Sequence, residues 1–302
     1  ADPYQISTVA DWTELTGTSA DWGAAFVLTA DLDLNGATLS PVGQLWSNPF
    51  TGILDGNGHA LRNANISGGS FMGIFCCMYN AKCSNLGLEN ISVSGGSYVG
   101  GLVGYASGAC TISNCYVSGS VSGSGSSIGG VVGYTEPDGY NYSYIVDCTA
   151  TCVVKADNIN AGGLVGEASW TTIKDCYSTG AVTATNGAAG GLLGHMWIST
   201  IMGCYAMGPV DGGGSYLGGL VGRMELKSTI SNSYAMGSVN GPQYVGGLVG
   251  GVNMFSNTVV YCYAMGPVNG AVEVGGFIGH RNAPVSNLVT ASYWDTETSG
   301  QA

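Results

Sequence analysis

The stretch Gly100-Gly101-Leu102-Val103-Gly104 decides the fold, because it returns along most of the chain at nearly constant spacing. Later copies begin at residues 129, 162, 190, 218, 246 and 275, so the successive steps are 29, 33, 28, 28, 28 and 29 residues. A degenerate copy, Met72-Gly73-Ile74-Phe75, precedes the first one. Self-similarity at a period of this size is typical of a repeat architecture, in which each repeat packs on its neighbours.

A second motif runs in step with the first and indicates that the repeats are β structure. Asn114-Cys115-Tyr116 is echoed by Asp175-Cys176-Tyr177, and further copies follow as far as Tyr293. Within each repeat, short runs of Val, Ile, Leu and Tyr alternate with Gly, Ser and Asn, which are strand and turn signals. One such repeat cannot bury its apolar side alone, whereas copies stacked about 4.8 Å apart share one core and pair their backbones.

We therefore predict an all-β chain, with a right-handed parallel β-helix of about nine coils and about 28 to 29 residues per coil over residues 46–302. Residues 1–45 lack the repeat, and we expect them to cap the first coil with a helix near Val9 to Leu15 and a strand at Phe26 to Thr29. Tyr293-Trp294-Asp295 should form a weaker cap at the other end.

The composition excludes several classes of partner. The chain has 52 glycines, only 9% charged residues and 45% hydrophobic residues, which is unlike a disordered segment. Its formal net charge is −12 and its seven Lys and Arg are scattered, which argues against nucleic acid and anionic membrane surfaces as partners. No apolar run approaches the roughly 20 residues that span a bilayer. Ala1-Asp2-Pro3 reads like an end left by signal-peptide removal, so we expect a secreted or cell-surface protein.

The repeated Gly-Gly-Leu-Val-Gly, together with copies such as Cys204-Tyr205-Ala206-Met207-Gly208-Pro209-Val210, resembles the GLUG-repeat family of bacterial and archaeal extracellular proteins. The resemblance covers roughly residues 46–302. It implies a β-helical module of large surface proteins, including adhesins and the non-catalytic region of some secreted metalloproteases. It supplies no catalytic motif that could be carried over to this chain.

Stacking in register turns sequence columns into ladders of side chains, which are usually structural. A short ladder of methionines is expected at Met207, Met236 and Met265. A longer aromatic ladder with one gap is expected at Tyr116, Tyr177, Tyr205, Tyr234, Tyr263 and Tyr293.

Four of the ten cysteines, Cys115, Cys148, Cys176 and Cys204, share one column, and serines take the same column at Ser233 and Ser292. Neighbouring coils bring their Cα atoms within disulfide range, but strands in register point their Cβ atoms in parallel. We therefore predict mostly free, buried thiols in this column, with disulfides favoured near Cys76, Cys83 and Cys110. No paired spacing suggests a zinc or iron–sulfur site.

Asp147 and Asp175 are the candidate catalytic pair. They share a column on neighbouring coils, so their carboxylates could approach to about 5 Å, the separation that retaining glycosidases use. The same column holds Asn114, Gly203 and Asn232, which instead favours a turn position for small polar residues.

A further column follows the glycine motif and brings Glu167, His195 and Arg223 onto successive coils, where we expect a solvated ladder of alternating charge. His59, His195 and His280 fall on widely separated coils, so they cannot form one metal site. No cofactor is expected, although calcium at acidic turns is an open alternative. Three sequons offer glycosylation sites, at Asn65, Asn90 and Asn141.

These observations favour a non-catalytic, structural or adhesive extracellular solenoid. We expect it to contact protein or glycan surfaces, or copies of itself end to end in a fibre, without inserting into a membrane. The alternative is a polysaccharide-degrading β-helix enzyme that uses Asp147 and Asp175.

Overall fold

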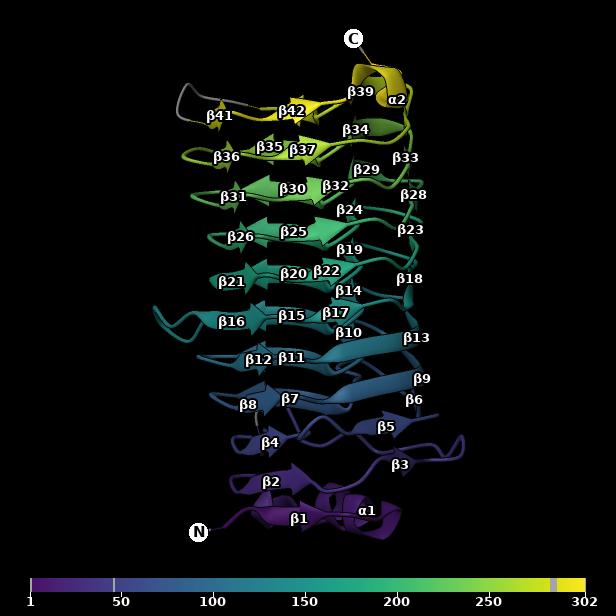
Figure 1. The fold of residues 1–302 in the computed structure, drawn as a ribbon, viewed down its shortest axis with the longest axis vertical. Helices are drawn as coiled ribbons and strands as arrows, with labels where there is room; N and C mark the ends of the chain where they lie inside the picture. Colours follow the sequence, from purple (N-terminus) through teal and green to yellow (C-terminus); the bar gives the residue numbers. More distant parts are fainter. Residues whose placement is uncertain (1, 46, 283–286, 302) are drawn as a thin grey trace.

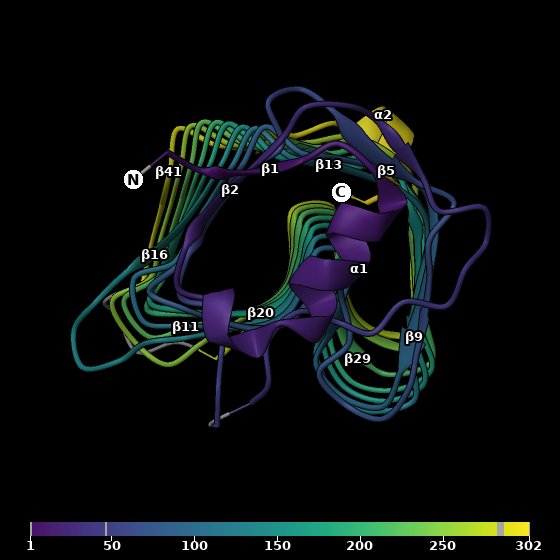
Figure 2. The same ribbon diagram turned by 90° about the horizontal axis from the view of Figure 1, so that it is seen from below.

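The chain folds into a rod of stacked coils, seen in Figure 1 as a computed structural model that describes residues 2–45, 47–282 and 287–301. Each strand pairs in parallel with strands of the coils before and after it; Val103, for example, lies between Phe75 and Val132. Seen from below, the chain passes clockwise from sheet to sheet as it recedes from the viewer, so the solenoid is right-handed (Figure 2). The predicted parallel β-solenoid of about nine turns is therefore confirmed. Ala1, where the expected processed end begins, lies outside the described residues.

Each full coil contributes to four sheets, numbered here in the order in which the chain passes through them. In the described residues, sheet 1 consists of β1 (Tyr4–Ile6), β2 (Ala25–Leu28), β4 (Ile53–Asp55), β8 (Lys82–Ser84), β12 (Thr111–Ser113), β16 (Ser143–Val146), β21 (Thr171–Lys174), β26 (Thr200–Met202), β31 (Thr229–Ser231), β36 (Thr258–Val260) and β41 (Leu288–Thr290).

Sheet 2 is the largest, because its long strands β9 and β13 join two columns of shorter strands. It consists of β3 (Leu32–Asp33), β5 (Ala60–Arg62), β6 (Asn65–Ser67), β9 (Gly87–Gly95), β13 (Tyr116–Gly123), β17 (Thr149–Ala150), β18 (Val153–Ala156), β22 (Tyr177–Ser178), β23 (Val182–Ala184), β27 (Tyr205–Ala206), β28 (Val210–Gly212), β32 (Tyr234–Ala235), β33 (Val239–Asn240), β37 (Tyr263–Ala264), β38 (Val268–Asn269) and β42 (Tyr293–Trp294).

Sheets 3 and 4 are the strands on either side of the glycine motif. Sheet 3 consists of β10 (Val99–Gly100), β14 (Ile128–Gly129), β19 (Ala161–Gly162), β24 (Ala189–Gly190), β29 (Ser215–Gly218), β34 (Gln243–Gly246) and β39 (Val272–Gly275). Sheet 4 consists of β7 (Phe75–Tyr79), β11 (Val103–Ser107), β15 (Val132–Glu136), β20 (Val165–Ser169), β25 (Leu193–Trp197), β30 (Val221–Glu225), β35 (Val249–Asn253) and β40 (Ile278–Arg281).

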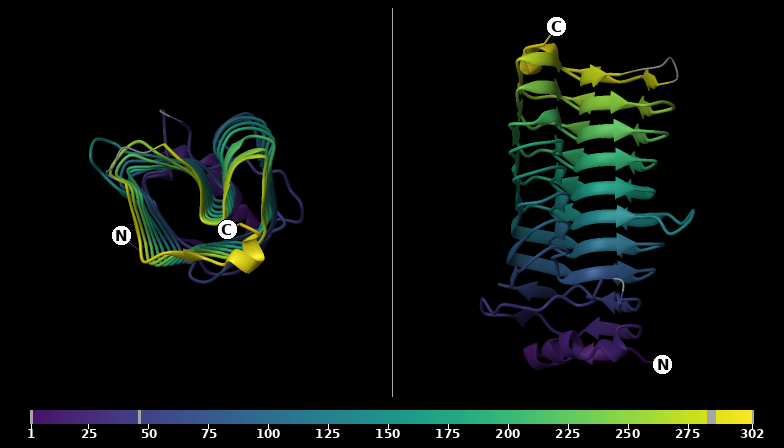
Figure 3. Two further views of the ribbon diagram at one scale, coloured as in Figure 1. Left: turned by 90° about the horizontal axis from the view of Figure 1, so that it is seen from above. Right: turned by 180° about the vertical axis from the view of Figure 1, so that it is seen from behind.

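Between sheets 3 and 4 the backbone folds inward, which gives the rod a two-lobed cross-section (Figure 3). The glycine motif makes this inward fold. A Cβ on Gly218 would lie 2.0 Å from the carbonyl oxygen of Val221, and one on Gly219 would lie 2.2 Å from the oxygen of Gly247 in the next coil. Backbone approaches this close exclude any side chain, so the glycines are needed for space. The apolar residue after them, such as Leu220, is fully buried at the apex of the fold.

The N-terminal segment caps the rod and is continuous with it. The helix α1 (Val9–Gly17) lies across the end of the core and buries Trp12 and Leu15, and the 3-10 helix η1 (Ser19–Asp21) follows it (Figure 2). The expected helix and the expected strand, β2, are thus both present. However, β1 and β2 are the first strands of sheet 1, so the stack begins before residue 46, earlier than the repeat pattern indicated.

The last coil is covered less well. Its strands β39, β40, β41 and β42 each lie at one edge of a sheet, and the only helix nearby in the described residues is the short α2 (Thr296–Ser299). Leu288 and Tyr293 remain 54% and 68% exposed, respectively. The ring of Trp294 packs toward Phe277, with centroids 6.5 Å apart, and so covers part of the core.

Candidate functional site

The Asp147 and Asp175 column forms the corner between sheets 1 and 2. Strand pairing places the two residues on neighbouring coils, as predicted, because Val146 pairs with Lys174. Both have left-handed backbones with φ of 52°, and so do Asn114 and Asn232 at 50° and 49°. Asn and Asp adopt this conformation more readily than most residues, so the column has the geometry that the turn interpretation requires.

The surroundings of the two carboxylates differ. Asp175 pairs with Lys174, with Nζ and Oδ2 3.3 Å apart. Asp147 borders a shallow hollow of about 360 Å³ together with Tyr116 and Tyr177, and Asp175 does not line it. In the coil below, the same corner is held by a side-chain amide, since Asn114 donates to Asn85 over 2.8 Å. The catalytic role of the pair stays a hypothesis.

Two of the three sequon asparagines form corner ladders of the same kind. The Nδ2 of Asn65 donates to the carbonyl of Gly36 over 2.8 Å, and that of Asn90 donates to Oδ1 of Asn63 over 2.8 Å. Asn141 lies in a loop and donates to the carbonyl of Asp138 over 3.0 Å. All three side chains are exposed, but glycosylation would have to replace these hydrogen bonds.

The expected tyrosine ladder lies on the outer face of sheet 2. Tyr177, Tyr205 and Tyr234 stack almost parallel, with ring centroids 4.7 and 5.0 Å apart. Tyr263 and Tyr293 continue the register above them, and Thr149 fills the gap above Tyr116. Because the rings stack on one another along the rod, the ladder stabilises the coils and presents mainly ring edges to solvent.

The cysteine column has a structural role that the sequence did not reveal. The sulfur of Cys176 accepts a hydrogen bond from the backbone N–H of Cys148 over 3.3 Å, and the hydroxyl of Ser233 accepts from the N–H of Cys204 over 3.1 Å. Each side chain therefore satisfies a buried corner N–H of the coil below, which explains why Cys and Ser alternate. Cys262 belongs to the same column, and its N–H donates to Ser292.

All ten cysteines lie in the described residues, and all are free thiols. The disulfides expected near Cys76, Cys83 and Cys110 are therefore absent from this structure. Burial raises the pKa of Cys110 to about 11 and that of Cys152 to about 12. Thiols held in the neutral form by burial are poor nucleophiles and poor metal ligands.

The Glu167, His195 and Arg223 column lines the inward fold and is largely buried, which corrects the expectation of a solvated ladder. Nε2 of His195 lies 3.0 Å from a carboxylate oxygen of Glu225, and Nδ1 lies 3.4 Å from one of Glu167. Glu225 is only 2% exposed and also pairs with Arg223. Glu225 went unrecognised because it faces Trp197 in the strand register, diagonally from the predicted column.

This network holds its charges by mutual contact. Burial lowers the pKa of His195, but its hydrogen bonds to Glu167 and Glu225 outweigh this effect and raise the pKa above the ordinary 6.5. Burial likewise raises the pKa of each glutamate, but hydrogen bonds and His195 bring the net value below the ordinary 4.5. Both ring nitrogens of the histidine are occupied, so the arrangement has no free position at which it could act as a general base or metal ligand.

A second column, on the sheet 3 side, faces this one and was not predicted. Its residues directly precede sheet 3, and many of them have left-handed backbones, such as Tyr98 with φ of 59° and Tyr216 with φ of 67°. The Tyr98 ring lies 6.1 Å from that of Tyr105 across the fold, and the guanidinium of Arg223 lies 5.4 Å from the Tyr216 ring centre. Side chains thus fill the inward fold from both sides.

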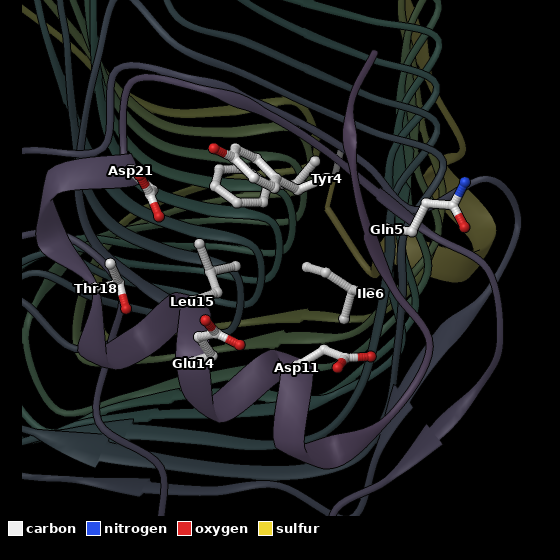
Figure 4. Close-up of a pocket in the computed structure, with 9 residues that line it drawn as sticks. Tyr4, Gln5, Ile6, Asp11, Glu14, Leu15, Thr18 and Asp21 are labelled. Carbon is white, nitrogen blue, oxygen red and sulfur yellow. The ribbon is translucent and has the colours of Figure 1, made fainter. Parts of the chain in front are cut away.

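A small cavity lies at the N-terminal end of the rod between α1, β1 and β2 (Figure 4). It measures about 130 Å³, well below the roughly 300 to 1,000 Å³ of small-molecule sites. The Asp11 carboxylate beside it already accepts hydrogen bonds from Ser7 and Thr8 at the start of the helix. The cavity is therefore a packing gap at the cap.

Within the described ranges, no group of three or more His, Cys, Asp or Glu side chains could hold a metal ion. Nor is any helix of residues 2–45, 47–282 or 287–301 long and apolar enough to cross a bilayer.

The fold and its columns define a repeat solenoid, and comparison with known proteins identifies the repeat. The family described as "The GLUG motif" matches residues 95–122 and 157–183. Each match spans a single coil, from the turn before sheet 3 through to sheet 2. The chain therefore carries GLUG repeats, and the resemblance inferred from the sequence is confirmed.

Among known proteins, the chain is similar to halomucin of Haloquadratum walsbyi (strain DSM 16790 / HBSQ001), with 34% identity over 134 residues. The match covers 40% of this chain and 1% of halomucin, so this chain corresponds to a very small part of that protein. A solved structure from Bacteroides ovatus, described as a "putative immunoglobulin A1 protease", superposes with a TM-score of 0.67 over 96% of this chain and 84% of that one. At 23% identity, this likeness shows the fold alone.

Proposed function

We propose that this chain is a non-catalytic, extracellular β-solenoid that acts through surface contacts, in a structural or adhesive role. The observation that carries the proposal is how the reactive side chains are used. The candidate carboxylates form left-handed corners, both nitrogens of His195 are engaged, and the cysteine column satisfies backbone N–H groups. What remains available on such a rod is its outer faces and its ends.

The location and the partners follow from the same proposal. The GLUG repeats support a place in a secreted or cell-surface protein, where the rod would face protein or glycan surfaces. The acidic charge disfavours nucleic acid as a partner. The exposed edge strands of the last coil, β39 to β42, support a second mode, in which copies associate end to end into a fibre.

The test compares binding with turnover on the same samples. Labelled protein is applied to surfaces coated with a panel of polysaccharides and glycoproteins, and reducing-sugar release is followed in parallel. We expect retention on some of these surfaces and no turnover. Turnover that disappears in Asp147→Asn or Asp175→Asn would instead establish the polysaccharide-degrading alternative. Sedimentation velocity over a concentration series tests the fibre, which requires growth in mass with concentration.

A further inference from the structure

One coil departs from the repeat by carrying a loop on its outer corner. Residues 137–142 connect β15 to β16, whereas in the coil above Trp170 alone connects β20 to β21. This loop accounts for the single 33-residue step and projects from the rod beside β16 (Figure 1). Insertions in a repeat stack lie on its surface and often mark its binding face.

A pocket of about 450 Å³ lies beside the start of this loop, within the size range of small-molecule sites. Tyr79, Ser107 and Glu136 are Cα partners in three successive strands, β7, β11 and β15. The small serine in the middle leaves space between the larger neighbours. Asp138 closes the pocket from the loop, and Tyr105 lines it from the neighbouring column of sheet 4.

Two tyrosine–carboxylate pairs arrange the polar groups of this pocket. The Tyr79 hydroxyl donates to Oδ2 of Asp138 over 2.5 Å, although the two residues are 59 positions apart in the sequence. The Tyr105 hydroxyl donates to Oε2 of Glu136 in the same way. A carboxylate has about four acceptor sites, and a phenol oxygen can also accept, so the pocket retains acceptor capacity. It therefore suits a ligand rich in hydroxyl donors.

The charge of the lining selects further among ligands. No Lys, Arg or His lines the pocket, while Glu136 and Asp138 both do, so a phosphate, sulfate or uronate would meet like charge. A metal ion is disfavoured as well, because nothing in the described chain gathers three or more suitable ligands. A neutral polyol or sugar fits both conditions.

The same loop carries aromatic rings that are open to solvent. Tyr140 is 85% exposed, and its ring centroid lies 5.4 Å from that of Trp170; the ring of Tyr142 lies at the same distance from Trp170 on the described side of the corner. An exposed aromatic group beside a pocket with a few placed polar atoms is the usual composition of a small-molecule site, and aromatic rings provide amphipathic contact area.

We propose that the pocket lined by Tyr79, Tyr105, Glu136 and Asp138 binds a neutral glycan, whose hydroxyls donate to the two carboxylates. This inference rests on the proposed function and assigns one adhesive contact of the rod to a defined place. It predicts that the face bearing the loop, and not the tyrosine ladder of sheet 2, recognises the sugar.

The test applies the full chain to an array of neutral and acidic oligosaccharides and then titrates the neutral glycans that bind. We expect Asp138→Asn and Tyr79→Phe each to weaken binding by about tenfold or more, since each removes a hydrogen bond of a charged acceptor. Matched controls, Asp211→Asn and Tyr263→Ala, alter an exposed carboxylate and a tyrosine on sheet 2 and should leave binding unchanged. Circular dichroism melts of every variant show whether the fold is retained.

Several results would overturn the inference. These are no binding to any neutral glycan, binding to acidic glycans only, loss of binding in EDTA, or equal binding by wild type and the two folded pocket variants. If the chain is still retained on coated surfaces in such a case, the proposed function stands and only this site fails. Sugar release by the wild type would count against the proposed function itself.

Discussion

Replacing Gly218 with Ala tests the physical reason for the repeat. The added Cβ would lie 2.0 Å from the carbonyl oxygen of Val221 and 2.6 Å from the backbone nitrogen of Gly250 in the next coil. Ordinary contact begins at 3.4 Å, so the first approach is too close by 3.4 minus 2.0, or 1.4 Å. Both obstacles are backbone atoms, so no side-chain rotation can relieve the overlap, and two coils must shift.

Overpacking of this kind costs about 1 to 3 kcal/mol, and rigid backbone obstacles place this site near the upper end. The reduced freedom of the unfolded chain offsets about 0.4 to 1 kcal/mol of that cost. The net loss of about 2 kcal/mol corresponds to a fall in melting temperature of roughly 4 to 8 °C, at about 2 to 4 °C per kcal/mol for a large domain.

The assay is thermal unfolding followed by circular dichroism, with Gly69→Ala as the matched control. A Cβ on Gly69 would meet nothing within 4 Å, and its φ is not in the left-handed range. The control should therefore melt at the wild-type temperature or slightly above it. If Gly218→Ala melts within about 1 °C of Gly69→Ala, the close approach of backbones at the inward fold is not what requires glycine.

Three further predictions concern the buried polar columns. His195→Gln should destabilise the chain more at about pH 5.5 than at about pH 9 in urea titrations, because the contribution of a raised pKa is present below 6.5 and lost as the pH rises through the folded value; equal effects at both pH values would contradict the charged network. Below about pH 4.5 the contribution of Glu225 should also be lost, since its pKa is lowered, so a Glu225→Gln variant and the wild type should converge in stability in strong acid. Cys176→Ser should keep the acceptor for the N–H of Cys148 and change the free energy of unfolding little, whereas Cys176→Val should cost about 1 to 3 kcal/mol; the reverse order would disprove the acceptor role.

The sequence predicts the columns of this protein well, because the coil length barely changes. A constant step of 28 or 29 residues fixes which side chains stack, so the tyrosine and cysteine columns and the Asp147 to Asp175 register could be derived by counting. The short cap helix could also be predicted, since Thr8 and Asp11 form a capping box at its start.

The inward fold could not be derived in the same way. Glycines at a sharp outward corner and glycines at a close approach of backbones give the same letters, and only the second arrangement buries Glu167 and His195. One signal was available: Tyr98, Tyr216 and Tyr244 recur directly before sheet 3, where a strand entering an outward corner has no evident need for a large ring.

The pocket beside residues 137–142 was beyond counting for another reason. The sequence shows that this coil is longer, but the direction of the extra loop determines that Asp138 meets Tyr79 two coils away. Loop direction depends on local turns and side-chain contacts, which the repeat does not specify.

The most direct test of the account measures distances along the rod between spin labels in one column of sheet 2. Ser94, Asp211, Asn240 and Asn269 belong to a single register, and Ser94 lies four, five and six coils below the other three. A Cys76→Ser background removes the half-exposed native thiol. The account predicts distances from Ser94 of roughly 19, 24 and 29 Å, rising by about 4.8 Å per coil. Unequal increments, or distances that do not grow with coil number, would contradict an in-register solenoid.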